Sequence, residues 1–361
     1  MEIQVKYPPK SLFPEFQFMD YRFPQPQFLG AKYRFRSWIA GFLPTDAKIV
    51  IEPFGGSQSM AYYFKQMGCC VHTNDFMSFS NAIGKALVEN KADQLDDADI
   101  RLLLSPNPDE RQFDLMRTLF TDVFFKEEDA TFIDAVRGNI ERLESPFKKA
   151  LALSTMNRAL TRKVTMGHFA HTQALVYAAD PERVKRNRSL VRPVRDLFLQ
   201  LIPEYNAAVF DNGEPCTSRR GDAIDFVEAV VNADVAYFDP PYGNSHSDYQ
   251  QFYHLLETYT EYWKDKTFVN GVKRYEPQRK TSFAQKSTIA GALECLFEKS
   301  ERIPCWILSY NDRSFPDINT LCEMVGRHRR VRIERRIYAA SRGGKGSVAG
   351  SSEILIIGEL K

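Results

Sequence analysis

Four consecutive residues, Asp239, Pro240, Pro241 and Tyr242, can together hold a flat ring that bears an amino group. They follow the apolar run 235–238, which predicts a buried strand that delivers them at its carboxyl end, where open α/β sheets bind ligands. The amino group of a nucleobase offers two N–H donors, which the Asp239 carboxylate and the Pro240 carbonyl can accept. The Tyr242 ring can stack on the base.

This arrangement suits the transfer of a methyl group to an amino nitrogen. Two accepted hydrogen bonds draw the nitrogen toward tetrahedral geometry and direct its lone pair, so catalysis rests on positioning and electrostatics. No covalent nucleophile is required. The same four residues also fit a turn in which the two prolines stop a strand and Asp239 caps a helix. Other motifs must decide between these interpretations.

A glycine turn lies far upstream of these residues. Gly55 and Gly56 follow a predicted strand at 48–52 and precede an apolar helical pattern. A second predicted strand at 70–73 leads to Asp75, at the interval after Gly55 that places a carboxylate on a ribose hydroxyl. The turn has only two glycines, so the glycine fingerprint of a dinucleotide-binding site is incomplete. The turn therefore favours a cofactor that contains adenosine but no pyrophosphate.

Four segments, in this order, resemble the Dam-like N6-adenine-specific DNA methyltransferases of the Asp-Pro-Pro-Tyr class. They are Phe-Leu-Gly-Ala-Lys at 28–32, Glu-Pro-Phe-Gly-Gly-Ser at 52–57, Asn-Asp at 74–75 and Asp-Pro-Pro-Tyr at 239–242. The family's usual form of the first segment has a second glycine where Ala31 stands. The resemblance covers roughly residues 25–85 and 215–360, and the combination is far more specific than any one segment.

The resemblance implies that S-adenosyl-L-methionine is the cofactor and that an adenine is flipped out of double-stranded DNA. Asp239, Pro240, Pro241 and Tyr242 would be the catalytic residues, and no metal ion is implied. Asp222, which follows Gly221, resembles the family's acid near the cofactor's adenine. The cofactor-binding residues expected from the resemblance are Phe28, Gly30, Lys32, Glu52, Pro53, Phe54, Gly55, Gly56, Ser57, Asp75, Asp222 and Asp239.

The middle of the chain has no counterpart among these segments. Apolar residues recur there at helical spacing, as in Leu115, Leu119 and Val123. We therefore expect an α/β protein with a Rossmann-like class I methyltransferase sheet and a mostly helical inserted domain. The expected catalytic domain is 1–85 and 215–361, and the expected DNA target-recognition region is 86–214.

Charge is distributed unevenly along this middle segment, although the formal net charge of the chain is only +2. Residues 85–146 contain eight Lys/Arg and fifteen Asp/Glu, whereas residues 147–220 contain thirteen and six. The second part should attract phosphates. A solvated helix face is the alternative explanation. The residues expected to bind DNA are Lys185, Arg186 and Arg188, together with Arg342 and Lys345 of a glycine-rich loop.

Composition restricts the class of protein. The 361 residues are enough for a Rossmann-size core and a second module. Six cysteines without a CxxC pair fit a reduced, cytoplasmic protein, and no apolar stretch is long enough to span a membrane. A cognate restriction or defence subunit is a possible partner that the resemblance implies.

Two other functions remain open at this point. An RNA methyltransferase acting on an adenine or guanine amino group could carry the same motifs, because flipped bases look alike outside the strand. A protein that binds nucleic acid through a degenerate methyltransferase fold is the other class. The intact glycine turn and Asp239–Tyr242 motif argue against the second.

Overall fold

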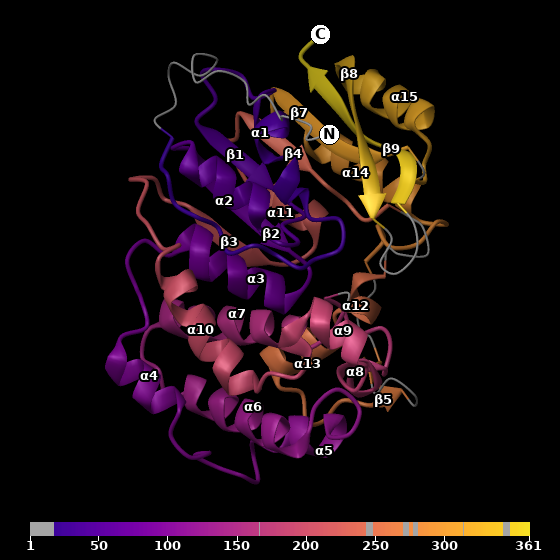
Figure 1. Cartoon of the computed structure of the whole chain (residues 1–361). Helices are drawn as coiled ribbons and strands as arrows, with labels where there is room; N and C mark the ends of the chain where they lie inside the picture. Colours follow the sequence, from indigo (N-terminus) through magenta and orange to yellow (C-terminus); the bar gives the residue numbers. More distant parts are fainter. Residues whose placement is uncertain are drawn as a thin grey trace.

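The computed structural model describes residues 18–165, 167–242, 248–269, 274–276, 281–312, 314–341 and 347–361. Its centre is a seven-stranded sheet in the order β3-β2-β1-β4-β7-β9-β8 (Figure 1). The strands of this sheet are β1 (Ile49–Glu52), β2 (Cys70–Asp75), β3 (Thr217–Arg220), β4 (Val235–Phe238), β7 (Cys305–Asn311), β8 (Arg330–Ser341) and β9 (Ser347–Glu359). A separate antiparallel pair consists of β5 (Phe268–Val269) and β6 (Arg274–Tyr275).

Most of the sheet is parallel. β3, β2, β1, β4 and β7 run in one direction, and β9 lies between β7 and β8, antiparallel to both. The order of the strands reverses between β1 and β4, so their carboxyl ends border a crevice in which such sheets bind ligands. The α/β fold and the expected strands at 48–52, 70–73 and 235–238 are therefore confirmed.

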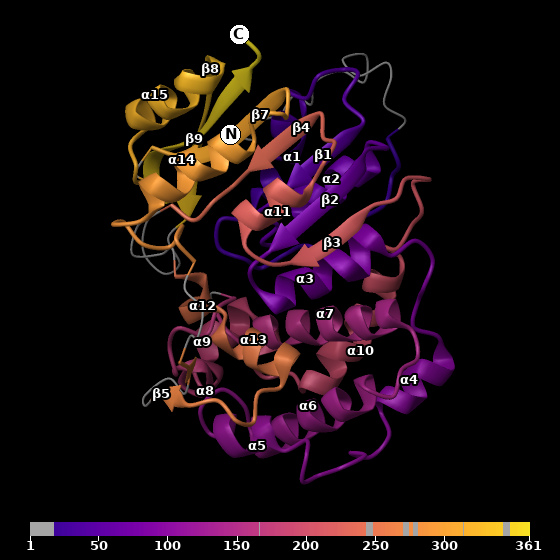
Figure 2. The ribbon, with the colours of Figure 1, turned by 180° about the vertical axis from the view of Figure 1, so that it is seen from behind.

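Helices cover both faces of the sheet (Figures 1 and 2), and they pack on it through two apolar cores. One core includes Val50 and Val71 of the sheet, Phe64 of α2 and Leu151 of α7. The other core includes Phe238 of the sheet and apolar residues of three helices. Helices of the first face are α1 (Arg36–Ala40), α2 (Ser59–Gln66), α3 (Ser78–Gly84) and α7 (Pro146–Arg162), and those of the second are α11 (Ala223–Ala229), α14 (Ile289–Lys299) and α15 (Ile318–His328).

Helices fill the chain between β2 and β3 and form the lower half of Figure 1. Besides α3 and α7 they are α4 (Asp97–Leu103), α5 (Leu115–Phe120), α6 (Glu127–Ile140), α8 (Ala174–Ala178), α9 (Pro181–Arg186) and α10 (Val194–Asn206), with a π-helix at Lys85–Glu89 and a 3-10 turn at Arg188–Leu190. α12 (Tyr249–Phe252) and α13 (His254–Glu261), which follow β4, lie beside them. Phe198 of α10 belongs to the same core as Val50, so these helices and the sheet share one apolar interior.

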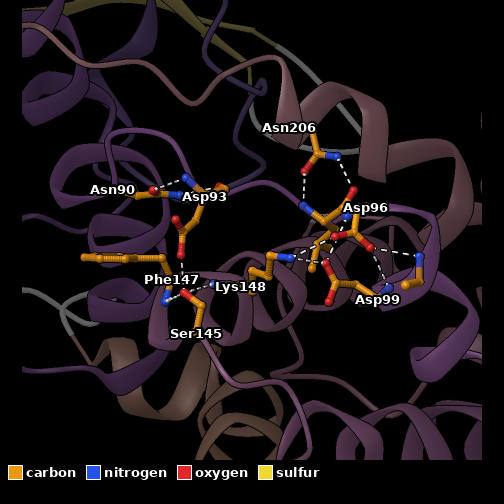
Figure 3. Close-up of polar contacts among 10 residues, drawn as sticks. Asn90, Asp93, Asp96, Asp99, Ser145, Phe147, Lys148 and Asn206 are labelled. Atoms are coloured by element: carbon orange, nitrogen blue, oxygen red, sulfur yellow. Dashed lines mark hydrogen bonds and ion pairs between the residues drawn. The ribbon is translucent and has the colours of Figure 1, made fainter.

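A cluster of hydrogen bonds and ion pairs connects α4 to α7 and α10 (Figure 3). Asp96 and Asp99 form a capping box at the start of α4. Lys148 Nζ of α7 donates to Asp96 Oδ2 at 3.0 Å and to Asp99 Oδ2 at 2.5 Å. The backbone N–H of Asp99 and the Lys148 ammonium lower the pKa of Asp96 to about 2. Asn206 of α10 bonds both the N–H and the carbonyl of Leu95.

Further ion pairs join the acidic and basic parts of the helical segment. Lys163 Nζ lies 3.1 Å from Asp129 Oδ2, and Lys149 Nζ lies 3.6 Å from Glu141 Oε2. Together with Lys148, these lysines pair with carboxylates of the same helical segment. Part of the local positive excess counted in the sequence is therefore not available to phosphates.

Three features bear on the class of protein. No helix in the described ranges is long and apolar enough to cross a membrane. Within the same ranges, no group of three or more His, Cys, Asp or Glu side chains is arranged to hold a metal ion. All six cysteines are free thiols.

Candidate active site

A cavity opens at the carboxyl ends of β1, β2 and β4. Every residue that the sequence predicts to bind cofactor lines this cavity, from Phe28 to Asp239. Of the four predicted catalytic residues, Asp239 and Pro241 line it. Tyr242 packs beside it, with its ring centroid 5.0 Å from that of Tyr310 on β7. One pocket thus combines segments that lie far apart in the chain.

The turn after β1 allows a ligand to approach the backbone closely. A Cβ on Gly55 would lie 2.2 Å from Gln58 Nε2 and 2.8 Å from Thr73 Oγ1, so a larger residue there would have to displace these buried side chains. Gly56 has a φ of +51°, which side chains other than glycine adopt at a cost. Local packing at Gly55 and backbone geometry at Gly56 therefore favour glycine at both positions, which line the cavity.

Asp75, at the end of β2, is positioned by the glycine turn. Its Oδ2 accepts the N–H of Gly56 at 2.6 Å, and its Oδ1 accepts the N–H of Met77 at 2.8 Å. Burial raises the pKa of Asp75, while these two hydrogen bonds oppose the rise. Each carboxylate oxygen has a second lone pair, so Asp75 can accept hydroxyl groups from a ligand as well.

Asp222 has a structural role in addition to its place in the cavity wall. Its Oδ1 accepts the N–H of Ile224 at 2.8 Å and so caps α11. Asn74 Nδ2 donates to the Gly221 carbonyl at 3.1 Å, which joins the end of β2 to the residue before this cap. The cap fixes the backbone at the edge of the cavity.

Phe28 is held in a stack of parallel rings. Its centroid lies 4.6 Å from that of Tyr253 and 5.5 Å from that of Tyr249, with interplanar angles of 6° and 2°. The Tyr253 hydroxyl accepts the N–H of Leu29 at 2.7 Å. Next to this stack, Gly30 has a φ of +77°, and a Cβ there would lie 3.2 Å from the Tyr249 hydroxyl. Residues after the catalytic motif thus position the first cofactor segment.

A buried charge cluster joins the first segment to the catalytic motif. Lys32 Nζ lies 3.2 Å from Asp239 Oδ1 and 3.2 Å from Glu353 Oε1 on β9, and it also contacts the Tyr242 hydroxyl. The Tyr242 hydroxyl donates to Asp239 Oδ1 at 3.0 Å. Lys32 is 4% exposed, Glu353 3% and Asp239 20%. The ammonium group is therefore almost enclosed by acids.

Electrostatics keep the lysine charged. Burial alone would lower the pKa of Lys32, but the carboxylates of Asp239 and Glu353 outweigh burial and raise it. Burial raises the pKa of both Asp239 and Glu353, and Lys32 opposes that rise. The cluster is therefore one coupled unit in which a single cation is shared by two acids.

Glu52, at the end of β1, contributes an unsatisfied polar atom to the cavity. Its Oε2 is buried and has no hydrogen-bond partner among the described residues. Burial, and next the charge of Asp239, raise the pKa of Glu52 well above its usual range. A buried acceptor without a partner is costly, so this atom suits a ligand that brings a donor or a positive charge.

Comparison with known proteins identifies the family. The sequence profile of the D12 class N6 adenine-specific DNA methyltransferases matches residues 28–311, which include the glycine turn and the Asp239 motif. The chain belongs to this family. As a D12 methyltransferase it acts on adenine in DNA, and the interpretation as an RNA methyltransferase has no support.

Two characterised proteins resemble this D12 methyltransferase along most of their length. The type II methyltransferase M2.HphI of Haemophilus parahaemolyticus is 28% identical over 345 residues, which cover 94% of this chain and 98% of that protein. The type II methyltransferase M.CviAII of Paramecium bursaria Chlorella virus 1 is 23% identical over 302 residues, which cover 80% and 83%. The similarity thus extends through the helical segment.

Three of the five predicted DNA-binding residues of the D12 methyltransferase lie at one end of the helical layer. Lys185 and Arg186 end α9, Arg188 begins the following 3-10 turn, and all three side chains are exposed. α9 lies near α12 (Figures 1 and 2), and the Phe169 N–H, just before α8, donates to the Phe252 carbonyl of α12 at 2.8 Å. Arg342 and Lys345 lie outside the described residues.

Sequence reasoning did not assign three residues that shape this site. Glu353 lies within the predominantly apolar strand β9, and Tyr249 and Tyr253 recur at helical spacing, which is typical of core positions of a helix. The signal that could have identified the tyrosines is their position just after the catalytic loop. Glu353 is an acid next to the apolar run 354–357, which is an unusual place for a charge in a strand.

Proposed function

We propose that this D12 methyltransferase binds S-adenosyl-L-methionine in the cavity and methylates the N6 amino group of an adenine flipped out of double-stranded DNA. When bound, the cofactor supplies an electrophilic methyl group on a positively charged sulfur. The single observation that carries the proposal is the direct contact between the cofactor cavity and the Asp239 motif, through Lys32. The cofactor and the target adenine would thus both lie beside the Asp239 carboxylate.

Residues of the cavity fit this cofactor. The glycine turn leaves room for the cofactor beside the backbone, and Asp75 offers carboxylate oxygens to the ribose hydroxyls. Asp222 would lie near the adenine, and Phe28 and Lys32 near the methionine end. The unsatisfied Glu52 oxygen provides an acceptor for a donor of the ligand. Pro53, Phe54, Gly30 and Ser57 would complete the walls.

In the catalytic motif, Asp239 and the Pro240 carbonyl would accept the two N–H groups of the adenine and orient its lone pair. Pro241 would fix the backbone, and Tyr242 would stack on the base. Flipping is required because an amino group in a stacked duplex cannot be reached by a buried carboxylate.

Asp75→Ala is expected to weaken the binding of S-adenosylmethionine about tenfold or more, since charge-assisted hydrogen bonds contribute about 1.5–3 kcal/mol. Titration calorimetry measures this directly. Because Asp75 also holds the backbone of Gly56, Asp75→Asn serves as a second variant that keeps one acceptor oxygen. Asp225→Ala, at an exposed acid on α11, is the matched control. Unchanged affinity in both Asp75 variants would remove this residue from the site.

Residues 86–214 would form the target-recognition region, inserted between the parts of a catalytic domain at 1–85 and 215–361. Two observations support this division: helices occupy the segment between β2 and β3, and α9, which carries exposed cations, lies near α12, the helix that follows the catalytic motif (Figure 1). DNA would contact Lys185, Arg186 and Arg188 there.

Replacement of Lys185, Arg186 and Arg188 together by alanine is expected to flatten the salt dependence of DNA binding by about 2–3 units of log–log slope, as each phosphate contact contributes nearly one. Fluorescence anisotropy at several salt concentrations measures the slope. Lys299 of α14, Arg327 of α15 and Arg330 of β8, which are exposed cations outside the helical segment, provide the matched triple control. If the two triple variants show equal salt-dependence slopes, the cations of α9 are exposed to solvent and do not contact DNA.

Biological context is part of the same proposal. Both named relatives are type II methyltransferases, which supports a role in a restriction-modification system, with a cognate restriction enzyme as partner in a cytoplasmic compartment. Digestion of methylated duplex DNA to nucleosides would reveal N6-methyladenine, and methylation-sensitive sequencing of DNA from expressing cells would give the site. Methyl groups on cytosine, or none on DNA, would contradict the proposed function.

A further inference from the structure

The Lys32 ammonium lies between two carboxylates that come from different strands. Asp239 follows β4, whereas Glu353 lies within β9, opposite Asn311 at the end of β7. Both Nζ–O distances are 3.2 Å. Glu353 is itself held in place, because its Oε1 accepts the Ser309 hydroxyl at 2.5 Å. The position of the lysine is thus defined from both sides.

This geometry bears on how Asp239 can bind substrate. The contacts from Lys32 and from the Tyr242 hydroxyl both fall on Oδ1, and within the described ranges no protein group bonds Oδ2. A buried lysine with Asp239 as its sole counter-ion would form a tight pair and occupy the carboxylate, since buried ions demand compensation. The adenine amino group would then have to displace an ammonium group to reach its acceptor.

We propose that Glu353 is a positioning residue for methyl transfer: it shares the Lys32 ammonium with Asp239 and so keeps Asp239 able to accept the target amino group. The proposal rests on the proposed role of Asp239 in holding the adenine. Glu353 touches neither reactant in this scheme and acts through Lys32. With two acids and one cation, the cluster carries a net negative charge when the target amino group enters.

Among the residues that the structure describes, the other titratable groups around the cluster do not supply a second counter-charge. The phenols of Tyr237, Tyr242 and Tyr249 face Lys32 or Asp239, and burial raises the pKa of each, which keeps them neutral. Glu52 also faces Asp239, and its own burial disfavours its charged form. Of these described groups, Glu353 is the one that offsets the lysine besides Asp239.

Glu353→Gln tests this proposal, because glutamine keeps the shape and the bond to Ser309 but removes the charge. We expect the single-turnover rate of adenine methylation to fall about tenfold or more near neutral pH. The acid limb of the rate profile should move to lower pH, since Lys32 would then pair with Asp239 alone and lower its pKa. Glu353→Asp, which restores the charge, should recover part of the methylation rate. It should also return the acid limb of the pH–rate profile to its original position.

Controls separate positioning from folding. Glu359→Gln changes an exposed acid on the same strand and should leave rate and pH profile unchanged. Affinities of Glu353→Gln for S-adenosylmethionine and for DNA should stay within about twofold of the unsubstituted protein. A normal rate, or a loss that is uniform across pH with an unmoved acid limb, would overturn the positioning role. Because the unsubstituted protein is assayed in parallel, absence of adenine methylation there would instead overturn the proposed function.

Discussion

Asp239→Ala is expected to lower the rate of adenine methylation by about a hundredfold or more while S-adenosylmethionine still binds. The substitution removes an acceptor that is needed most when the amino nitrogen becomes tetrahedral. Lys32 retains Glu353 as a counter-ion, at 3.2 Å, so the variant should fold. Single-turnover methylation of duplex DNA measures the rate, and calorimetry measures cofactor affinity.

The pH dependence of the same rate gives an independent check. Burial raises the pKa of Asp239, and Lys32 opposes the rise without cancelling it. The ionised acceptor is therefore lost as pH falls through a value above the usual aspartate pKa of about 3.9. Asp239→Asn is the matched variant, because it keeps the shape but removes the charge and should lose this acid limb. Near-normal methylation by Asp239→Ala would contradict the assignment.

Tyr242→Ala is expected to weaken the retention of the flipped adenine by about 1–3 kcal/mol, the range measured for stacking of a base on an aromatic ring. The structure assigns the side chain two separable contacts. Its ring packs edge-on against Tyr310, with the centroids 5.0 Å apart, and its hydroxyl bonds Asp239. Ring and hydroxyl can therefore be tested independently.

A fluorescent adenine analogue at the target position reports extrusion of the base directly. Tyr242→Phe keeps the ring, so it should preserve the fluorescence increase that Tyr242→Ala loses, and Tyr242→Trp should largely restore it. A slower methyl transfer in Tyr242→Phe with normal extrusion would isolate the role of the hydroxyl at Asp239. If phenylalanine loses the extrusion signal as fully as alanine, stacking is not the function of this residue.

Much of the fold could be predicted because its signals are local. The apolar run before Asp239 is buried on both faces of a parallel sheet, so it reads as a strand from sequence alone. Gly56 favours glycine because of its own backbone conformation, with a φ of +51°, which is a local property of the turn. These local patterns place the cavity at the carboxyl ends of β1, β2 and β4.

Glu353 could not be assigned in this way, because its position depends on the order of the sheet. β9 runs antiparallel to β7, so the middle of β9 reaches the edge of the sheet where the parallel strands end. A search of residues that follow apolar runs therefore misses it. The sequence likewise suggests that Lys148 and Lys163 can attract phosphates. In the structure, each pairs with an acid that is distant in the sequence.

The pairing of Lys32 with Glu353 has a consequence for biosynthesis. Lys32 and Asp239 leave the ribosome well before β9, and the strand that supplies Glu353 inserts between β7 and β8 only after both have been made. Such long-range strand pairings form late, whereas the local helices can form early during translation. A nascent chain that has not reached β9 thus has Asp239 but lacks Glu353, the second counter-charge of its lysine. Full methyltransferase activity would arise only after β9 has been translated. Unfinished chains would therefore leave the adenines of nearby DNA unmethylated.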